Sequence, residues 1–397
     1  MISNTGEYLR QNKTILFLFV LWAFRLLFLM QGNEGGVAIN QFVLVQIFAE
    51  LGIFAVLLCS GFNFFLIFFT QPMAWFCLLY LMGVFSILWG EFPLMGGYFA
   101  FQNIIMVSAL YYLASRTRDF LQLERFYIFA NLFILWAFFI RTILLGGGYF
   151  HSVAYSTVAG YLLVYSVAEY DPGSRPPENL KILRKGIFWG ILGLAVTTSG
   201  GAMVSVAAAF CVLAMFAKQP LLKLGAFLGL SALLIGYFSG AADWVYELLF
   251  PGKTMAAIST GHGRKFIWDM ILERAQERPW LGWGYASVER TLPIYCIDAH
   301  NSVVGVIGSL GYIGCTLLIL GMLSLFFFVL GRTSLMGMRG LLAAAVCGLV
   351  NSNTSNFIAS KAGLQALAFQ MVVVMAAVCV MFAQKKTVSS LQERLHP

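Results

Sequence analysis

Long apolar runs alternate with short polar connections along almost the whole chain. Most of the runs hold 17 to 24 residues, a length that crosses a hydrocarbon core of roughly 30 Å as an α-helix but exceeds what a barrel strand needs. The pattern therefore predicts an all-α polytopic membrane protein with about twelve transmembrane helices in a single bundle over residues 1–397. The predicted spans are Thr14–Met30, Val37–Ser60, Met73–Gly90, Tyr98–Ala114, Phe126–Leu145, Phe150–Glu169, Gly186–Ser199, Ala202–Ala217, Leu221–Gly240, Ser302–Leu330, Gly340–Phe357 and Gly363–Ala383.

The seventh and eighth spans are short and meet at Ser199-Gly200-Gly201. A single broken helix is the alternative, but their joint length exceeds one ordinary crossing. Two helices are therefore expected here.

Composition agrees with the hydropathy pattern. The chain is 60% hydrophobic and 11% charged, with a mean hydropathy of +0.83. So few polar side chains cannot cover the surface of a soluble globule.

The distribution of positive charge predicts the orientation. With the N-terminus in the cytoplasm, sixteen of the 25 Lys and Arg residues fall on cytoplasmic segments, as the positive-inside rule requires. Both termini are then cytoplasmic, and the large polar loop 241–301, between the ninth and tenth spans, is periplasmic. The net charge of +8 is mainly a topology signal and not an indication of nucleic-acid binding.

The large loop carries most of the candidate chemistry. An apolar stripe over Gly263–Arg278 predicts a short interfacial or bundle-capping helix, which Pro279 ends. An aromatic, glycine-punctuated turn, Pro279–Tyr285, follows, and the loop closes on His300-Asn301 at the start of the tenth span.

These motifs, in this order, resemble the signature of the bacterial O-antigen ligase and O-antigen polymerase superfamily. The matching residues are Gly263-Arg264, Trp268, Pro279-Trp280-Leu281-Gly282-Trp283-Gly284, His300-Asn301 and Leu310-Gly311-Tyr312-Ile313-Gly314. One departure is visible. Family members commonly have Ser-Arg-Gly where this chain has Ser199-Gly200-Gly201, so a second phosphate-binding arginine is missing there.

The resemblance implies a glycosyltransferase of the bacterial inner membrane whose active site faces the periplasm. It would move a glycan from an undecaprenyl-diphosphate carrier in the membrane lipid to an acceptor hydroxyl, without a metal or other cofactor. The acceptor is a glycan in a polymerase of O-antigen or exopolysaccharide and the lipid A core in a ligase of lipopolysaccharide biosynthesis. Other polysaccharide-assembly membrane proteins are candidate partners, and nucleic acid is not.

The resemblance also assigns roles to residues. His300 would take the proton of the acceptor hydroxyl, and Arg264 would hold the diphosphate. Arg141 is the first substitute for the missing arginine and Lys361 the second. Asn301, Asp298 and Trp268 would support the site.

Each of these residues also has a purely structural interpretation. His300 and Arg264 are alternatively a helix-capping histidine and a solvated loop cation, Arg141 snorkels to the membrane surface, and Lys361 lies in a solvated loop. Arg25 and Glu50 lie deeper in their predicted spans and are expected to form a structural ion pair. At the level of the whole protein, the leading hypothesis is a polymerase. The alternatives are a ligase, glycan transfer to protein, and a non-enzymatic transporter or flippase of lipid-linked glycan.

Overall fold

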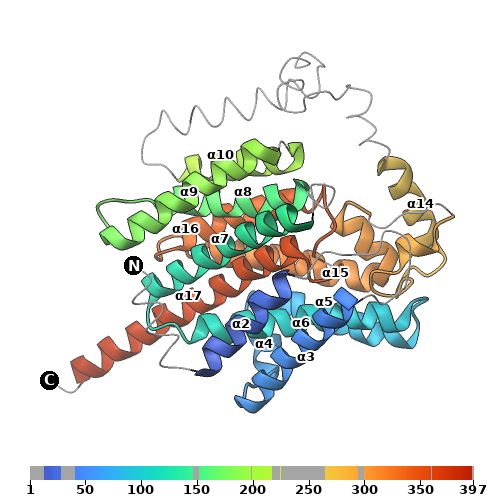
Figure 1. The fold of residues 1–397 in the computed structure, drawn as a ribbon, viewed down its shortest axis with the longest axis horizontal. Coiled ribbons are helices and arrows are strands. Elements are labelled where there is room, and N and C mark those ends of the chain that lie inside the picture. Colours follow the sequence, from blue (N-terminus) through green and yellow to red (C-terminus); the bar gives the residue numbers. More distant parts are fainter. Residues whose placement is uncertain are drawn as a thin grey trace.

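The described part of the chain is an elongated bundle of α-helices (Figure 1). The computed structural model describes residues 13–27, 41–145, 152–197, 199–216, 224, 264–293, 299–358 and 360–395. Every helix within these residues is as follows: α2 Lys13–Leu27, α3 Gln41–Cys59, α4 Phe65–Phe69, α5 Met73–Phe85, η1 Ser86–Leu88, α6 Pro93–Ser115, α7 Phe120–Leu145, α8 Ser152–Glu169, α9 Pro177–Thr197, α10 Gly200–Met215, α14 Arg264–Gln276, η3 Val288–Thr291, α15 Ser302–Leu330, α16 Met338–Asn351 and α17 Leu364–Leu395.

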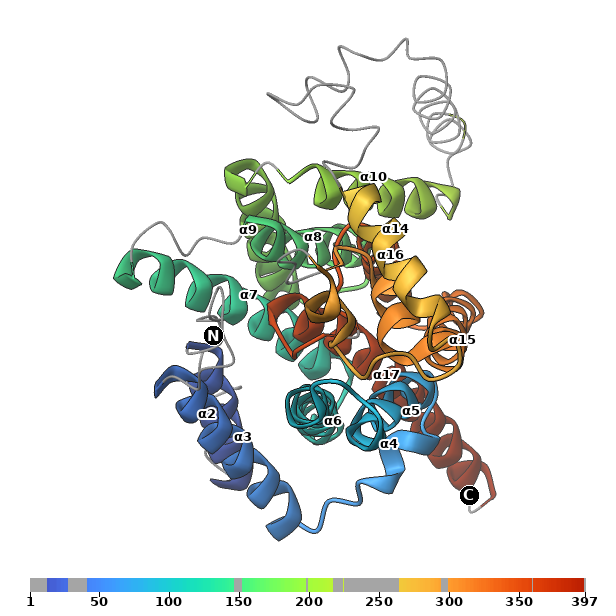
Figure 2. The same ribbon diagram turned by 90° about the vertical axis from the view of Figure 1, so that its right-hand side faces the viewer.

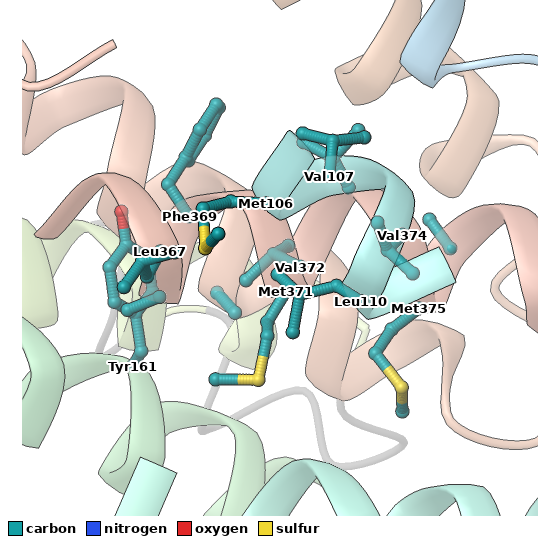
Figure 3. Close-up of a cluster of buried hydrophobic side chains, with 14 of the residues drawn as sticks. Met106, Val107, Leu110, Tyr161, Leu367, Phe369, Met371, Val372, Val374 and Met375 are labelled. Atoms are coloured by element: carbon teal, nitrogen blue, oxygen red, sulfur yellow. The ribbon is translucent and has the colours of Figure 1, made fainter. Parts of the chain in front are cut away.

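Helix α17 is the centre of the bundle. It contacts α6, α7, α8 and α16, and nearly every side chain of its first half is buried. Figure 3 shows its apolar residues packed between Met106 and Leu110 of α6 and Tyr161 of α8. A helix that is apolar on all sides is expected at the core of a bundle surrounded by other helices.

The structure confirms a helical protein with the character of a polytopic membrane protein, and the number of twelve spans remains a prediction. Four described helices or helix segments are long and apolar enough to cross a membrane: Pro93–Ser115, Phe120–Ala137, Ser302–Leu330 and Leu364–Lys385. Shorter apolar helices cover four more predicted spans. The ninth predicted span, Leu221–Gly240, lies outside the described residues apart from Leu224.

Two details of the predicted spans are decided by the structure. The seventh and eighth spans are separate helices, α9 and α10, and Ser199 before α10 has an extended backbone. The eleventh span was expected to reach Phe357, but α16 ends at Asn351. The helix stops because the polar residues 351–356 at its end use their carbonyls and side chains for bonds outside the helix.

Helix α14 lies at one end of the bundle, at the right of Figure 1, and we call this the α14 end. The C-terminus of the chain lies at the opposite end. Figure 2 looks onto the α14 end, where α14 runs alongside α15 and the connection from α16 to α17 comes close to both. The predicted site residues Arg264, His300 and Lys361 belong to this part of the molecule.

Candidate active site

Helix α14 is the short helix that the apolar stripe predicts. It covers Arg264–Gln276, and two residues of the stripe, Ile271 and Ala275, are buried. They form a small core of their own with residues of the following turn, of η3 and of the segment before α15: Trp283, Val288, Leu292 and Ala299. This packing fixes α14 against the first part of α15.

The aromatic turn is docked into a break in α15. Gly311 has a left-handed backbone (φ 63°), which interrupts the helix and leaves amides and carbonyls on both sides without helical partners. The turn supplies those partners: the amide of Tyr312 donates to the carbonyl of Pro279 (2.8 Å), and the amide of Trp283 donates to the carbonyl of Gly308 (3.1 Å). The glycine motif of the aromatic turn and the glycine motif around Gly311 therefore bond to each other. We call this contact the joint between the turn and α15.

Tyr285 anchors the same turn in the bundle. Its ring is fully buried against Gly83 of α5, and its backbone lies against Gly96 of α6. Its hydroxyl donates to the carbonyl of Ser360 (3.1 Å), and its amide donates to the hydroxyl of Ser86 (3.0 Å). The loop is therefore held by α5, α6 and the connection between α16 and α17.

His300 lies immediately before α15 in a left-handed backbone conformation (φ 52°). That conformation is uncommon for a residue with a side chain and persists only where its neighbours hold it. On one side, the Trp268 indole donates to the carbonyl of Ala299 (2.7 Å). On the other side, the Asn301 side chain caps α15 by accepting from the amides of Val303 (2.9 Å) and Val304 (3.1 Å).

The imidazole of His300 is half-buried, and it is kept neutral. Burial and, as the smaller cause, the positive charge of Arg264 together lower the pKa of His300 from 6.5 to about 4. A neutral imidazole at physiological pH has a lone pair with which to accept a proton. The geometry therefore gives His300 the protonation state that a general base needs.

Arg264 is the first residue of α14, and its guanidinium donates from Nη1 to the carbonyl of Thr354 (3.1 Å). The segment that accepts this bond also accepts hydrogen bonds from Asn301 and Ser302, next to His300, and the positive charge of Arg264 lowers the pKa of the imidazole. Two residues that are 36 positions apart in the sequence are thus brought together at the α14 end.

A polar segment that the sequence analysis missed lies beneath both residues. It comprises Asn351–Asn356, which begins with the last residue of α16. Besides the bond from Arg264, its carbonyls receive the amide of Ser302 at Ser352 (2.8 Å) and the hydroxyl of Ser302 at Ser355 (3.2 Å). A run of six polar residues between two apolar runs was the available signal.

The start of α10 also reaches this segment. A Cβ added at Gly201 would lie 2.6 Å from the hydroxyl oxygen of Thr354, so the glycine backbone is in close contact with that side chain. The position where family members commonly carry the second arginine therefore lies next to the residue that binds Arg264. In this chain the position holds only Gly200.

A second group missed by the sequence analysis is a buried carboxylate. Glu289, in η3, is 2% exposed, and its Oε1 accepts from Nδ2 of Asn356 (3.3 Å). The Asn356 amide in turn lies against Gly305 in the second turn of α15. Nothing in the local sequence distinguished Glu289 from the other charged residues of the loop.

The remaining predicted site residues are placed only in part. Asp298 lies outside the described residues. Arg141 belongs to the last turns of α7, but its side chain is outside the description. Lys361 is exposed in the connection between α16 and α17, seven residues after Thr354. Within the described residues, no three His, Cys, Asp or Glu side chains are grouped so as to hold a metal ion.

Fold and site together define a helical membrane protein whose candidate site combines an arginine from a loop helix with a histidine at the start of a long apolar helix. The O-antigen ligase family model matches residues 186–319, about a third of the chain, which include the second half of α9, all of α10 and α14, and most of α15. Over these residues the chain therefore matches the family that its motifs resemble. No curated protein matches the sequence.

Proposed function

We propose that the protein transfers a glycan from an undecaprenyl-diphosphate carrier to a sugar hydroxyl at the periplasmic face of the inner membrane, as a polymerase of a surface polysaccharide. The observation that carries the proposal is the half-buried, neutral imidazole of His300 beside the guanidinium of Arg264. A base next to a fixed cation is the pair that this transfer requires.

In the proposed reaction, the acceptor oxygen attacks the anomeric carbon of the donor glycan. His300 takes the proton of the acceptor hydroxyl as the new C–O bond forms. The bond between the anomeric carbon and the diphosphate oxygen breaks, and its electron pair leaves with the diphosphate. Arg264 stabilises that leaving charge, because a guanidinium presents two parallel N–H donors to phosphate oxygens.

The second cation for the diphosphate remains part of the proposal. Arg141 is at the end of α7, and Lys361 follows the polar segment that binds Arg264. Variants Arg141→Gln and Lys361→Gln separate the two: the one that contributes raises the KM for the donor. If neither variant changes the KM, both substitutes are wrong.

The proposal is tested with purified protein in liposomes that contain a polyprenyl-diphosphate-linked repeat unit. We expect release of the polyprenyl diphosphate together with a ladder of longer carrier-linked glycans. Release that requires added lipid A core and gives a glycan on that core identifies a ligase instead. Movement of the donor across the bilayer without any release identifies a transporter and contradicts the proposal.

A further inference from the structure

The polar segment Asn351–Asn356 touches both halves of the candidate site. Four consecutive carbonyls face them: Ser352 and Ser355 accept from Ser302, Asn353 accepts from the Asn301 side chain (3.4 Å), and Thr354 accepts from Arg264. We propose that Thr354 is a positioning residue, which holds the guanidinium of Arg264 at a fixed place relative to the imidazole of His300. Its catalytic consequence rests on the proposed function.

The segment is braced from the interior of the bundle. The Asn351 amide donates to the Thr157 hydroxyl of α8 (2.7 Å), and the Gln365 amide of α17 donates to the same oxygen (2.9 Å). The hydroxyl of Ser355 then donates to Oε1 of Gln365 (3.0 Å). Because all four of these side chains are buried, the bonds do not compete with water, and the segment has little freedom to move.

Thr354 connects these buried hydrogen bonds to the candidate site. Its hydroxyl is 3.0 Å from both the backbone carbonyl and Oδ1 of Asn351, its side chain is in close contact with Gly201, and its own carbonyl accepts from Arg264. The bonds to Asn351 and the contact with Gly201 hold Thr354 in place, so the backbone carbonyl that accepts from Arg264 has a fixed direction. Arg264 is a long, flexible side chain, so a fixed acceptor reduces the number of rotamers that it samples before the donor binds.

The pKa of His300 reports whether Arg264 is held in place, because the charge of Arg264 contributes to that pKa. Among the described residues, the charge that acts on the imidazole of His300 is that of Arg264 on α14. The carboxylate of Glu289 on η3 bonds to Asn356, whose amide lies against Gly305. The polar segment and the first turn of α15 contribute hydroxyls and amides only. If Arg264 moves away, its contribution to the lowered pKa of His300 decreases, and the pKa rises toward 6.5.

The test variants are Thr354→Val, which removes the hydroxyl at constant size, and Thr354→Ser, which retains it. Thr316→Val is the matched control, because Thr316 is exposed on α15 and its hydroxyl bonds only to the carbonyl of Tyr312 within the same helix. The full chain in nanodiscs, labelled with 13C-histidine, contains only four histidines, and the His300 signal is assigned with His300→Asn.

We expect the pKa of His300 to rise in Thr354→Val and to stay near its wild-type value in Thr354→Ser and Thr316→Val. In the liposome assay, Thr354→Val should lower kcat about 10- to 100-fold, the scale of a misplaced catalytic group. Thr354→Ser should stay within about threefold of wild type, as most conservative changes do.

A second variant, Gly201→Ala, tests the same inference in case Thr354→Val does not fold. Gly201→Ala displaces Thr354 without removing a polar group, because the new Cβ would lie 2.6 Å from the Thr354 hydroxyl. The pKa of His300 should rise in this variant too. An unchanged pKa in whichever of the two variants elutes as folded protein overturns the inference. Because the titration needs no substrate, it decides the matter even if the wild-type protein releases no polyprenyl diphosphate, which would overturn the proposed function alone.

Discussion

Two arginines of this protein, Arg25 and Arg264, show how the same side chain serves different purposes. Arg25 is 1% exposed, its Nε donates to Glu50 at 2.5 Å, and its Nη2 donates to the carbonyl of Ala362 (3.0 Å). Arg264 is half-buried, donates to the neutral carbonyl of Thr354, and its charge acts on the imidazole of His300.

The partners explain the difference in role. Glu50 also accepts from Tyr98 (2.8 Å) and Gln102 (2.9 Å), so the carboxylate and Arg25 form a buried network that ties α2, α3 and α6 to the connection before α17. A charge inside such a network holds helices together, as expected for the structural ion pair predicted from the sequence. The charge of Arg264 is instead directed at a group that can take part in chemistry. Variants should therefore affect activity in one case and stability in the other.

The largest effect is expected for His300→Ala. Loss of a general base typically costs about 10²- to 10⁴-fold in rate, and release of polyprenyl diphosphate should fall by this factor. The bundle should keep its stability, because the Asn301 cap and the Trp268 bond to Ala299 remain. His396→Ala, the same change near the C-terminus, is the control. Release in His300→Ala at the wild-type rate would remove this residue from the mechanism.

Arg264→Ala should lower kcat about 10²- to 10³-fold, the usual cost of removing one group that stabilises a developing negative charge. Arg264→Lys should recover only part of this loss, because an ammonium lacks the planar pair of donors. Lys265→Ala removes the same charge one position further along α14 from an exposed side chain and should retain activity. Equal losses in the two alanine variants would indicate a general effect of positive charge and not a specific role of Arg264.

Gly311→Ala tests whether the joint between the turn and α15 keeps the two halves of the site together. The new Cβ would lie 2.4 Å from the carbonyl carbon and oxygen of Trp280, and the left-handed backbone disfavours a side chain. We expect activity to fall about tenfold or more as α14 shifts relative to α15. Gly321→Ala, in a helical part of α15 where the nearest atom is 3.1 Å away on the Phe76 ring, should have a much smaller effect. Comparable losses in both variants would show that the joint has no special role.

The parts of this molecule that the sequence predicts are those marked by a pattern among neighbouring residues. The α14 helix follows from an apolar stripe ended by Pro279, and the cap at Asn301 follows from an asparagine directly before a long apolar run. The resemblance named Arg264 and His300, but only the fold brings them together. The segment Asn351–Asn356 was assigned to a transmembrane helix because apolar residues flank it, and its bonds are made to residues distant in the sequence. Tertiary contacts of this kind leave no local pattern.

Glu50→Gln should have the opposite signature from Arg264→Ala. It leaves the charge of Arg25 buried without its carboxylate, which typically costs about 3–5 kcal/mol, so the thermal inactivation temperature in detergent should fall. The kcat of the protein that remains folded should stay close to wild type. The double variant Arg25→Met with Glu50→Met removes both charges and should regain most of the lost stability. A decrease in kcat without a loss of stability would show that the pair takes part in the reaction.

The smallest expected effect is on the pH dependence of the rate. The pH profile of kcat/KM reports the free enzyme, and the profile of kcat reports the complex with the donor. With the pKa of His300 at about 4, kcat/KM should stay nearly constant from pH 8 down to pH 5.5, where roughly 97% of the imidazole is still neutral. An ordinary histidine would be only about 10% neutral at that pH, so kcat/KM would fall about tenfold. A bound diphosphate places negative charge beside Arg264 and favours the imidazolium. The acidic limb of kcat, which reports the donor complex, should therefore lie at higher pH than the limb of kcat/KM. If both limbs lie at pH 6.5, the pKa of His300 is that of an ordinary histidine in the free enzyme and in the complex. The proximity of Arg264 to His300 would then not matter to the reaction.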